Sequence, residues 1–271
     1  MNIGAIVLKL RAKNNAALPQ YHGRLLHAAF LTMVRSIDSD FSARMHDAET
    51  KNFSIGLLRF AHENLNGYKY IIGTNDIAYL RVAGLGDEIV DFILNIIPGI
   101  LLRIGSAEFE IAAVYTNQQQ SSEAGFTSTE SLFEACSEMP SMRRITINFI
   151  TPAVFKYFNV DYPLPKPEFI FGSLAERWNS INEKQQFDIV KIKEMAQVAV
   201  VPDNWTGETK RIRHGENRYV TAFTGRFTYR LDLLPEDLRS IFITLSEFGV
   251  FSGVGRLTGQ GFGRITVKYE Q

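Results

Sequence analysis

Residues 249–267, GVFSGVGRLTGQGFGRITV, carry six glycines within the fifteen positions from 249 to 263. Glycine at this density indicates a backbone that adopts unusual dihedral angles or approaches another group closely. A helical pattern precedes the segment and a strand pattern follows it. Dinucleotide-binding and P-loop sites require the opposite order, a strand, a glycine loop and then a helix, and neither the GxGxxG nor the GK[ST] spacing occurs here. The segment therefore excludes both of these nucleotide-binding folds.

The elements around this segment form a repeated order in the second half of the chain. Pro235 at a helix start is followed by apolar residues at helical spacing, and alternation of apolar and polar residues indicates the strands. The expected elements are a strand at 144–150, a helix at 170–181, a strand at 198–201 that ends at Pro202, a hairpin containing Gly207 and Gly215, a strand at 219–231, a helix at 238–248 and a strand at 265–269.

The first half of the chain predicts the same order. Its helices are recognised from apolar residues at helical spacing, and Pro98 with Gly99 ends the second one. The expected elements are a strand at 3–10, a helix that opens at residues 14–19 and runs to Ile37, a polar loop at 38–52, a strand at 53–60, extended segments at 68–72 and 77–82, a helix at 87–97, and strands at 101–104 and 108–115.

Strand, helix, strands, helix and strand in each half is the βαββαβ order of a ferredoxin-like domain. The sequence therefore predicts an α+β protein with tandem ferredoxin-like (RRM-like, βαββαβ) domains and a C-terminal glycine-rich loop. We expect an N-terminal domain at 1–120, a polar linker region at 121–142, and a C-terminal domain at 143–271 that ends in the glycine-rich loop.

Composition narrows the class of protein. The 271 residues are 45% hydrophobic and 21% charged, enough for a sizeable core without metal or disulfide support. The charges of the 29 basic and 29 acidic residues cancel, so the net charge gives no indication of a nucleic-acid or membrane partner. Cys136 is the single cysteine, and residues 1–10 lack the pattern of a signal peptide, so we expect a cytoplasmic protein.

Basic residues nevertheless gather in two segments of the second half. The first holds Lys210, Arg211, Arg213, Arg218, Arg226 and Arg230 with Glu216 as its one acid, and the second holds Arg256, Arg264 and Lys268 with none. Each segment alone is equally consistent with an ordinary solvated surface. Together they favour RNA or DNA as the partner, with the glycine-rich backbone binding phosphates. The alternative for the glycines is a set of tight turns under a domain interface.

Histidine supplies the candidates for acid–base chemistry, because its pKa lies nearest to neutrality. His22 falls on the apolar face of the first helix, which predicts a packed core residue, and His27 lies at the edge of that face. His46 is expected in the loop after this helix, near Lys51. The sequence contains no zinc-binding Cys/His cluster, HExxH motif or EF-hand loop, so no metal and no cofactor is expected.

Several stretches together resemble one known family. They are GRLLHAAFL (23–31), SARMHDAETKNFSIGLL (42–58), FITPAVFKYFNVDYPLPKPEFIFGSLAERWN (149–179), VVPDNWTGETK (200–210) and FSGVGRLTGQGFGRITV (251–267). They are similar to the CRISPR-associated endoribonucleases that process repeat RNA, within the RAMP superfamily. The order GVGxxTxxGFG is the most specific of these motifs, and the resemblance covers nearly the whole chain.

The resemblance implies an RNA groove between two ferredoxin-like domains and metal-independent cleavage of CRISPR repeat RNA (pre-crRNA) into guide RNAs. The ribose 2′-hydroxyl would attack the adjacent phosphate and leave a cyclic phosphate and a 5′-hydroxyl. Such a reaction needs a base, an acid and cations around the phosphorane, which histidine and lysine can supply. By the same resemblance, His46 is the expected general acid or base and Lys51 the transition-state stabiliser, with His27 as the second candidate.

The resemblance also assigns partners. We expect CRISPR repeat RNA to contact Lys210, Arg211, Arg213, Arg218, Arg256, Gly259, Gly261, Gly263 and Arg264. Other CRISPR effector subunits form a second class of partner, no membrane partner is expected, and the protein is expected to be a monomer or a homodimer. The alternative function is a non-catalytic RAMP-type subunit that holds guide RNA in an interference complex.

Overall fold

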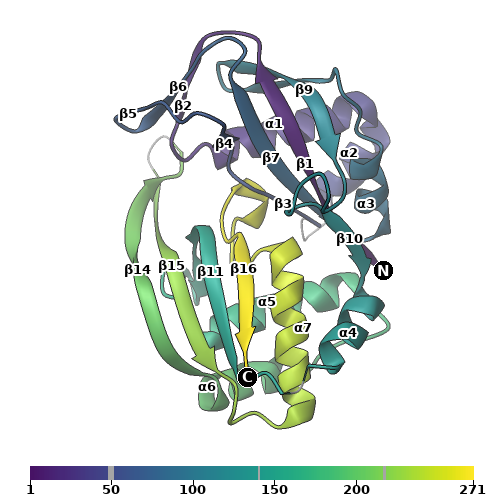
Figure 1. Cartoon of the computed structure of the whole chain (residues 1–271), viewed down its shortest axis with the longest axis vertical. Helices are drawn as coiled ribbons and strands as arrows, with labels where there is room; N and C mark the ends of the chain where they lie inside the picture. The colour runs from purple at the N-terminus through teal and green to yellow at the C-terminus, as the bar shows by residue number, and fades with distance from the viewer. Residues whose placement is uncertain (48–51, 140, 216–217) are drawn as a thin grey trace. The chain divides into compact units, whose positions relative to one another are not determined.

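The computed structural model describes residues 1–47, 52–139, 141–215 and 218–271, and of residues 46 and 47 the backbone only. The chain forms two compact units (Figure 1). The N-terminal unit comprises residues 4–126 together with 259–261, and the C-terminal unit comprises residues 1–3, 127–258 and 262–271. Three residues of the glycine-rich segment thus belong to the N-terminal unit.

The N-terminal unit is built on an antiparallel sheet with the strand order β3-β7-β1-β9-β8, and β4 pairs with β7. The first four strands of this order are the second, third, first and fourth strands of a βαββαβ domain, which confirms the ferredoxin-like prediction. The elements are β1 (Asn2–Ala12), α1 (Gly23–Ile37), α2 (Ser39–Asp47), β3 (Phe53–Ile55), β4 (Arg59–Phe60), β7 (Ile77–Leu85), α3 (Asp87–Leu94), β8 (Leu101–Ile104) and β9 (Ala107–Tyr115).

A second, smaller sheet explains where the first helix begins. Its strand order is β2-β6-β5, from β2 (Ala16–Pro19), β5 (Leu65–Asn66) and β6 (Lys69–Ile72). Residues 16–19, expected to open the helix, pair instead with residues 69–72, and α1 starts at Gly23. Pairing with a strand that lies far along the chain overrides the local helical preference there.

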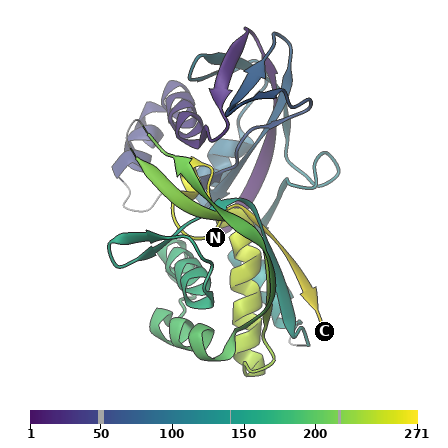
Figure 2. The ribbon, with the colours of Figure 1, turned by 90° about the vertical axis from the view of Figure 1, so that its left-hand side faces the viewer.

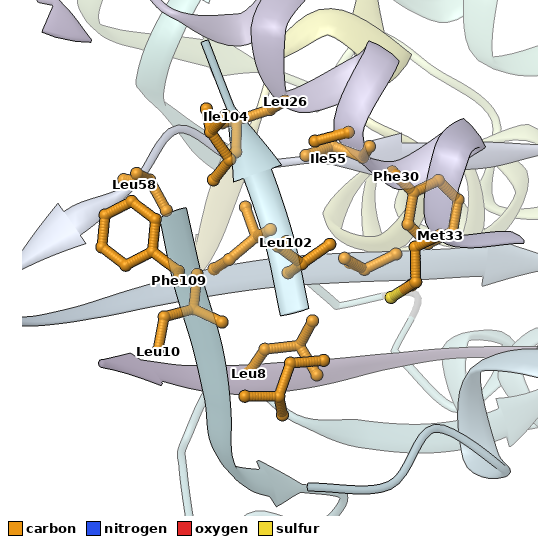
Figure 3. Close-up of a cluster of buried hydrophobic side chains, with 14 of the residues drawn as sticks. Leu8, Leu10, Leu26, Phe30, Met33, Ile55, Leu58, Leu102, Ile104 and Phe109 are labelled. Carbon is orange, nitrogen blue, oxygen red and sulfur yellow. The ribbon is translucent and has the colours of Figure 1, made fainter. Parts of the chain in front are cut away.

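The core of the N-terminal unit forms where α1 packs on the sheet. Leu26, Phe30 and Met33 lie on the buried face of the helix. They meet Leu58, which precedes β4, and side chains of several strands, as Figure 3 shows for Leu8, Leu10, Ile55, Leu102, Ile104 and Phe109. Phe30 also packs on Phe53, with ring centroids 5.1 Å apart. Truncating a buried Phe of this kind to Ala typically costs about 3–5 kcal/mol of stability.

The C-terminal unit repeats the ferredoxin-like order. Its antiparallel sheet has the strand order β14-β15-β11-β16, again second, third, first and fourth. Figure 2 shows α5 and α7 on the same side of this sheet. The elements are β10 (Gly125–Ser128), α4 (Thr129–Ser137), β11 (Arg144–Ala153), β12 (Phe155–Tyr157), β13 (Val160–Tyr162), α5 (Pro167–Ile181), α6 (Ile189–Ala199), β14 (Val201–Arg213), β15 (Tyr219–Arg230), α7 (Glu236–Ser252), the 3-10 turn η1 (Thr258–Gln260) and β16 (Ile265–Glu270).

Several expected boundaries are wrong for physical reasons. Residues 198 and 199 end α6, and the next strand does not stop at Pro202 but runs from Val201 to Arg213. Pro202 is tolerated because β14 is an edge strand with a register shift beside this residue. The expected loop at 38–52 contains α2, and the expected linker at 121–142 contains β10 and α4. The strand expected at 53–60 is interrupted between β3 and β4.

Candidate active site and RNA-binding surface

The glycine-rich segment adopts the unusual backbone that its composition predicts. Four of its glycines have positive φ angles, +69° at Gly253, +72° at Gly255, +84° at Gly261 and +68° at Gly263. Gly261 and Gly263 are buried, so they lie away from solvent in the described structure. This placement favours the packed-turn interpretation for these two residues, and an RNA contact by them stays a prediction.

Residues 259–261 pack tightly against the start of α1. A Cβ atom added to Gly23 would lie 1.8 Å from the carbonyl oxygen of Gln260, so only glycine permits this approach. On the other side of the contact, a Cβ atom at Gly261 would lie 2.6 Å from Cδ2 of Leu57. The two glycines therefore let the backbone of the C-terminal segment lie directly on the helix that carries His27.

His27 is oriented by this contact. Its Nδ1 lies 2.8 Å from the carbonyl oxygen of Gly259, and its ring stacks on Phe53 with centroids 5.6 Å apart and an interplanar angle of 21°. A carbonyl oxygen only accepts, so Nδ1 carries the proton and donates it. In the neutral ring the lone pair is consequently on Nε2. A half-buried imidazole held in one tautomer and one plane can accept a proton at Nε2 as a base, or donate one there when charged.

Arg24 is a candidate that sequence reasoning missed. It lies on α1 three residues before His27, and residues at this spacing are neighbours on a helix surface. Its side chain is exposed, whereas the opposite face of α1 is core. The spacing of Arg24 and His27 could have identified Arg24 from the sequence, because a cation one helical turn from an acid–base residue can approach the phosphate on which that residue acts.

His22 has the structural role that its apolar position predicts. Its Nδ1 donates to the carbonyl oxygen of Pro19 at 2.9 Å, and its Nε2 accepts from the backbone N–H of Leu58 at 3.0 Å. Burial lowers the pKa of His22 from 6.5 to about 4, because desolvation disfavours the charged ring. The residue is therefore a neutral link between the start of α1 and the segment after β3.

The structure corrects the expected setting of His46. This residue lies on α2 and not in a loop, and its side chain lies outside the described part of the chain. Lys51 lies outside the described residues altogether. Their catalytic roles therefore stay predictions.

The basic residues of the long β14–β15 hairpin divide between its two faces. Side chains alternate along a strand, so Arg211 and Arg213 share one face and Lys210 lies on the other. The Arg211 guanidinium lies 4.4 Å from the ring centroid of Tyr219, a cation–π contact on the shared face. Lys210 pairs with Glu208 at 2.7 Å on its own face. All three basic side chains are exposed.

Two other predicted RNA-binding arginines meet at one carboxylate. Arg256 bonds to Oδ1 of Asp161, and Nη2 of Arg218 lies 3.6 Å from Oδ2 of the same residue. Asp161 lies on β13, so this small hairpin is tied both to the glycine-rich segment and to Arg218, the residue before β15. Arg264 is half-buried before β16, and its backbone N–H donates to Oγ1 of Thr151 at 3.0 Å.

Arg177 on α5 fixes the residue next to Gly259. Its Nη1 donates at 2.6 Å to the carbonyl oxygen of Ser252 and at 2.6 Å to Oγ1 of Thr258. Burial lowers the pKa of Arg177 to about 10, still well above neutrality, so the side chain remains charged. Arg177 is part of the RWN stretch of the sequence, but only the structure shows that it hydrogen-bonds to both the end of α7 and the start of η1.

In the part of the chain that the structure describes, no three histidine, cysteine, aspartate or glutamate side chains gather into a set that could hold a metal ion. No described helix is both long enough and apolar enough to span a bilayer.

The two units and the glycine-rich segment define a protein built from tandem ferredoxin-like domains. The family model for the CRISPR Cas6 N-terminal domain matches residues 4–134, and the model for the CRISPR-associated endoribonuclease Cas6 matches residues 147–265. The chain belongs to the Cas6 family, as its sequence motifs predicted.

Individual relatives agree with this assignment. CRISPR-associated endoribonuclease Cas6 of Mycobacterium tuberculosis is 30% identical over 129 residues, which are 48% of this chain. The matched part spans only 40% of that relative's length. Among solved structures, a Cas6 product complex has a TM-score of 0.78 at 24% identity and covers 98% of this chain and 100% of its own. Thermus thermophilus Cas6 has a TM-score of 0.73 at 24% identity and covers 98% of each chain. At these identities the structural likeness shows the fold.

Proposed function

We propose that this protein is an endoribonuclease that cleaves CRISPR repeat RNA and releases guide RNAs. The observation that carries the proposal is the match of two Cas6 family models to the two halves of one chain. The curated relative from M. tuberculosis is itself named an endoribonuclease, and one similar solved structure is a Cas6 product complex. The exposed basic side chains of the β14–β15 hairpin supply a surface that suits an RNA backbone.

The proposed reaction is an internal transesterification. The 2′-hydroxyl oxygen bonds to the adjacent phosphorus while a base takes its proton, and the bond from phosphorus to O5′ breaks as an acid protonates that oxygen. The products are a 2′,3′-cyclic phosphate and a 5′-hydroxyl, and no water or oxidant is consumed. Because both proton transfers can use side chains, the proposed route needs no metal ion.

His27 is the acid–base residue that the described geometry favours. The Gly259 carbonyl holds the proton on Nδ1, which directs Nε2 to the reaction, and stacking on Phe53 fixes the ring plane. A backbone carbonyl here does what a carboxylate does for other catalytic histidines, orienting the ring and selecting its tautomer. Arg24 would stabilise the charge on the phosphorane, as Lys51 would if it reaches the same phosphate. His46 is the competing candidate, as its sequence motif predicts.

Replacing each histidine in turn tests this proposal. The wild-type protein should cleave labelled repeat RNA in EDTA, and a 2′-deoxy nucleotide at the scissile position should block the reaction. His27→Ala should slow single-turnover cleavage by ~10²–10⁴-fold with little change in RNA affinity, the usual effect of losing a positioned acid or base. His62→Ala is the matched control, because His62 is exposed and outside α1.

Three outcomes would change the assignment. If His46→Ala abolishes cleavage and His27→Ala does not, the acid–base role belongs to α2 and the endoribonuclease proposal stands. If EDTA stops the wild-type reaction, the metal-independent route is wrong. If the wild-type protein binds repeat RNA and leaves it intact, the protein is a non-catalytic RNA-binding subunit instead.

A further inference from the structure

The hairpin formed by β12 and β13 ends in a strained aromatic residue. Tyr157 pairs with Val160, so residues 158 and 159 alone form the turn. Phe158, the first of the two, has a φ angle of +49°. Turns of this length usually place glycine or asparagine at a positive-φ position, and a bulky side chain there is a genuine outlier. The hairpin projects from the C-terminal unit as a separate two-stranded element (Figure 2).

The strain is not compensated by burial of the ring. The Phe158 side chain is 79% exposed, and its neighbours Tyr157 and Val160 are 45% and 58% exposed. A phenylalanine in solvent contributes almost nothing to the core, and its backbone conformation is unfavourable. Glycine or asparagine at this position would therefore suit folding better. Outliers of this kind concentrate at functional sites.

The exposed ring nevertheless has an aromatic neighbour. Tyr157 meets Phe158 edge-on, with centroids 4.7 Å apart and an interplanar angle of 71°. Tyr157 in turn packs against Phe169 of α5 at 5.5 Å, and Tyr162 packs against the same ring at 5.2 Å. The hairpin therefore presents the Phe158 ring beside aromatic residues that pack on a helix.

Cations lie on both faces of the hairpin, because Lys156 and Asp161 alternate with the aromatic residues Tyr157 and Tyr162 along their strands. Lys156 is exposed on β12, and Lys166 lies with its Nζ 5.4 Å from the Tyr162 centroid. Asp161, on the opposite strand of the hairpin, holds Arg218 and Arg256. Arg218 keeps a side-chain exposure of 59% in this pair. A ligand that combines a planar, stackable ring with negative charge matches this combination, and a nucleotide is such a ligand.

We propose that Phe158 is a stacking platform for an unpaired base of the bound RNA, with the neighbouring cations facing the RNA backbone. The inference rests on the proposed function, because it names an additional contact for the same RNA. Base–aromatic stacking of this type is tolerant of sequence and acts on single strands. The hairpin would thus hold an unpaired stretch of the transcript.

Phe158→Asn separates this role from stability. Asparagine tolerates positive φ, so the variant should fold and melt at the wild-type temperature or above it. Its affinity for a 12-nucleotide single-stranded RNA of mixed sequence should fall by about 5- to 150-fold, the range for losing one stacked base. An abasic strand of the same length should bind the wild type and the variant equally. Tyr68→Asn is the matched control, because Tyr68 is an 85% exposed aromatic residue at another short hairpin turn, between β5 and β6.

The outcomes distinguish this inference from the proposed function. If the wild type binds the 12-mer and Phe158→Asn binds it equally well, the platform is refuted and the endoribonuclease proposal stands. If the variant instead changes the oligomeric state and leaves RNA affinity unchanged, the hairpin is a protein contact and the platform is likewise refuted. If the wild type binds neither the 12-mer nor repeat RNA, both proposals fail.

Discussion

Acid is expected to destabilise the N-terminal unit through one buried histidine, His22. In the folded protein burial lowers the pKa of His22 to about 4, whereas an unfolded chain has the ordinary value of 6.5. Between these values the unfolded state binds a proton that the folded state does not. The free energy of unfolding therefore falls as the pH falls, beginning near pH 6.5 and ending near pH 4.

The size of the effect follows from the same pKa values. Each pKa unit of difference between the two states corresponds to about 1.36 kcal/mol, so the full loss is about 3 kcal/mol, and roughly 2.5 kcal/mol of it is expected by pH 4.5. Protonation would also remove the bond that Nε2 accepts from Leu58, which links α1 to the segment after β3. Losing that link would disturb the helix that carries His27.

Urea unfolding at pH 7.5 and pH 4.5 measures this effect against a variant that cannot titrate. His22→Gln keeps a donor and an acceptor but has no proton to bind, so its stability should depend less on pH than the wild type by roughly 2.5 kcal/mol over this interval. His62→Gln makes the same change at an exposed position and should behave as the wild type does. Equal pH dependence of the wild type and His22→Gln would refute the assignment of His22 as a buried neutral residue.

Two further substitutions test the loop and the hairpin. Gly261→Val should lower the melting temperature and slow RNA cleavage, because a β-branched residue resists a φ of +84° and its Cβ would collide with Leu57. A variant that melts at the wild-type temperature and cleaves RNA at the wild-type rate would contradict this prediction. Arg211→Glu with Arg213→Glu should weaken RNA binding and reduce the slope of log affinity against log salt by ~0.7 for each lost phosphate contact, as measured by salt titration. Arg103→Glu on β8 is the control, and an unchanged slope in the double variant would mean that this face of the hairpin does not meet RNA.

The order of the elements was predictable from the sequence because each half alternates strands and helices with clear periodicity. What the sequence could not show are elements decided by distant pairing. Residues 16–19 form a strand because they pair with residues 69–72. Pro202 is tolerated in a strand because β14 lies at the edge of its sheet and its register shifts beside this residue. Local propensity contains neither fact. The small β12–β13 hairpin was also missed, since its turn lacks the glycine that usually marks one.

The candidate site was only partly predictable for a related reason. The resemblance of the first helix to the family identified His27 as a candidate, but the group that orients it is a backbone carbonyl 232 positions later in the chain. Any residue type has such a carbonyl, so no side-chain motif can reveal this partner. What marks it is glycine: a Cβ atom at position 259 would lie 3.3 Å from Cε2 of Phe53 and 3.6 Å from Nδ1 of His27. A larger residue would press on the Phe53 ring, on which the His27 ring stacks. The glycine-rich segment therefore supports the proposed chemistry by packing closely on α1 and orienting His27. This role needs no direct contact between Gly261 and RNA, and Gly261 is buried.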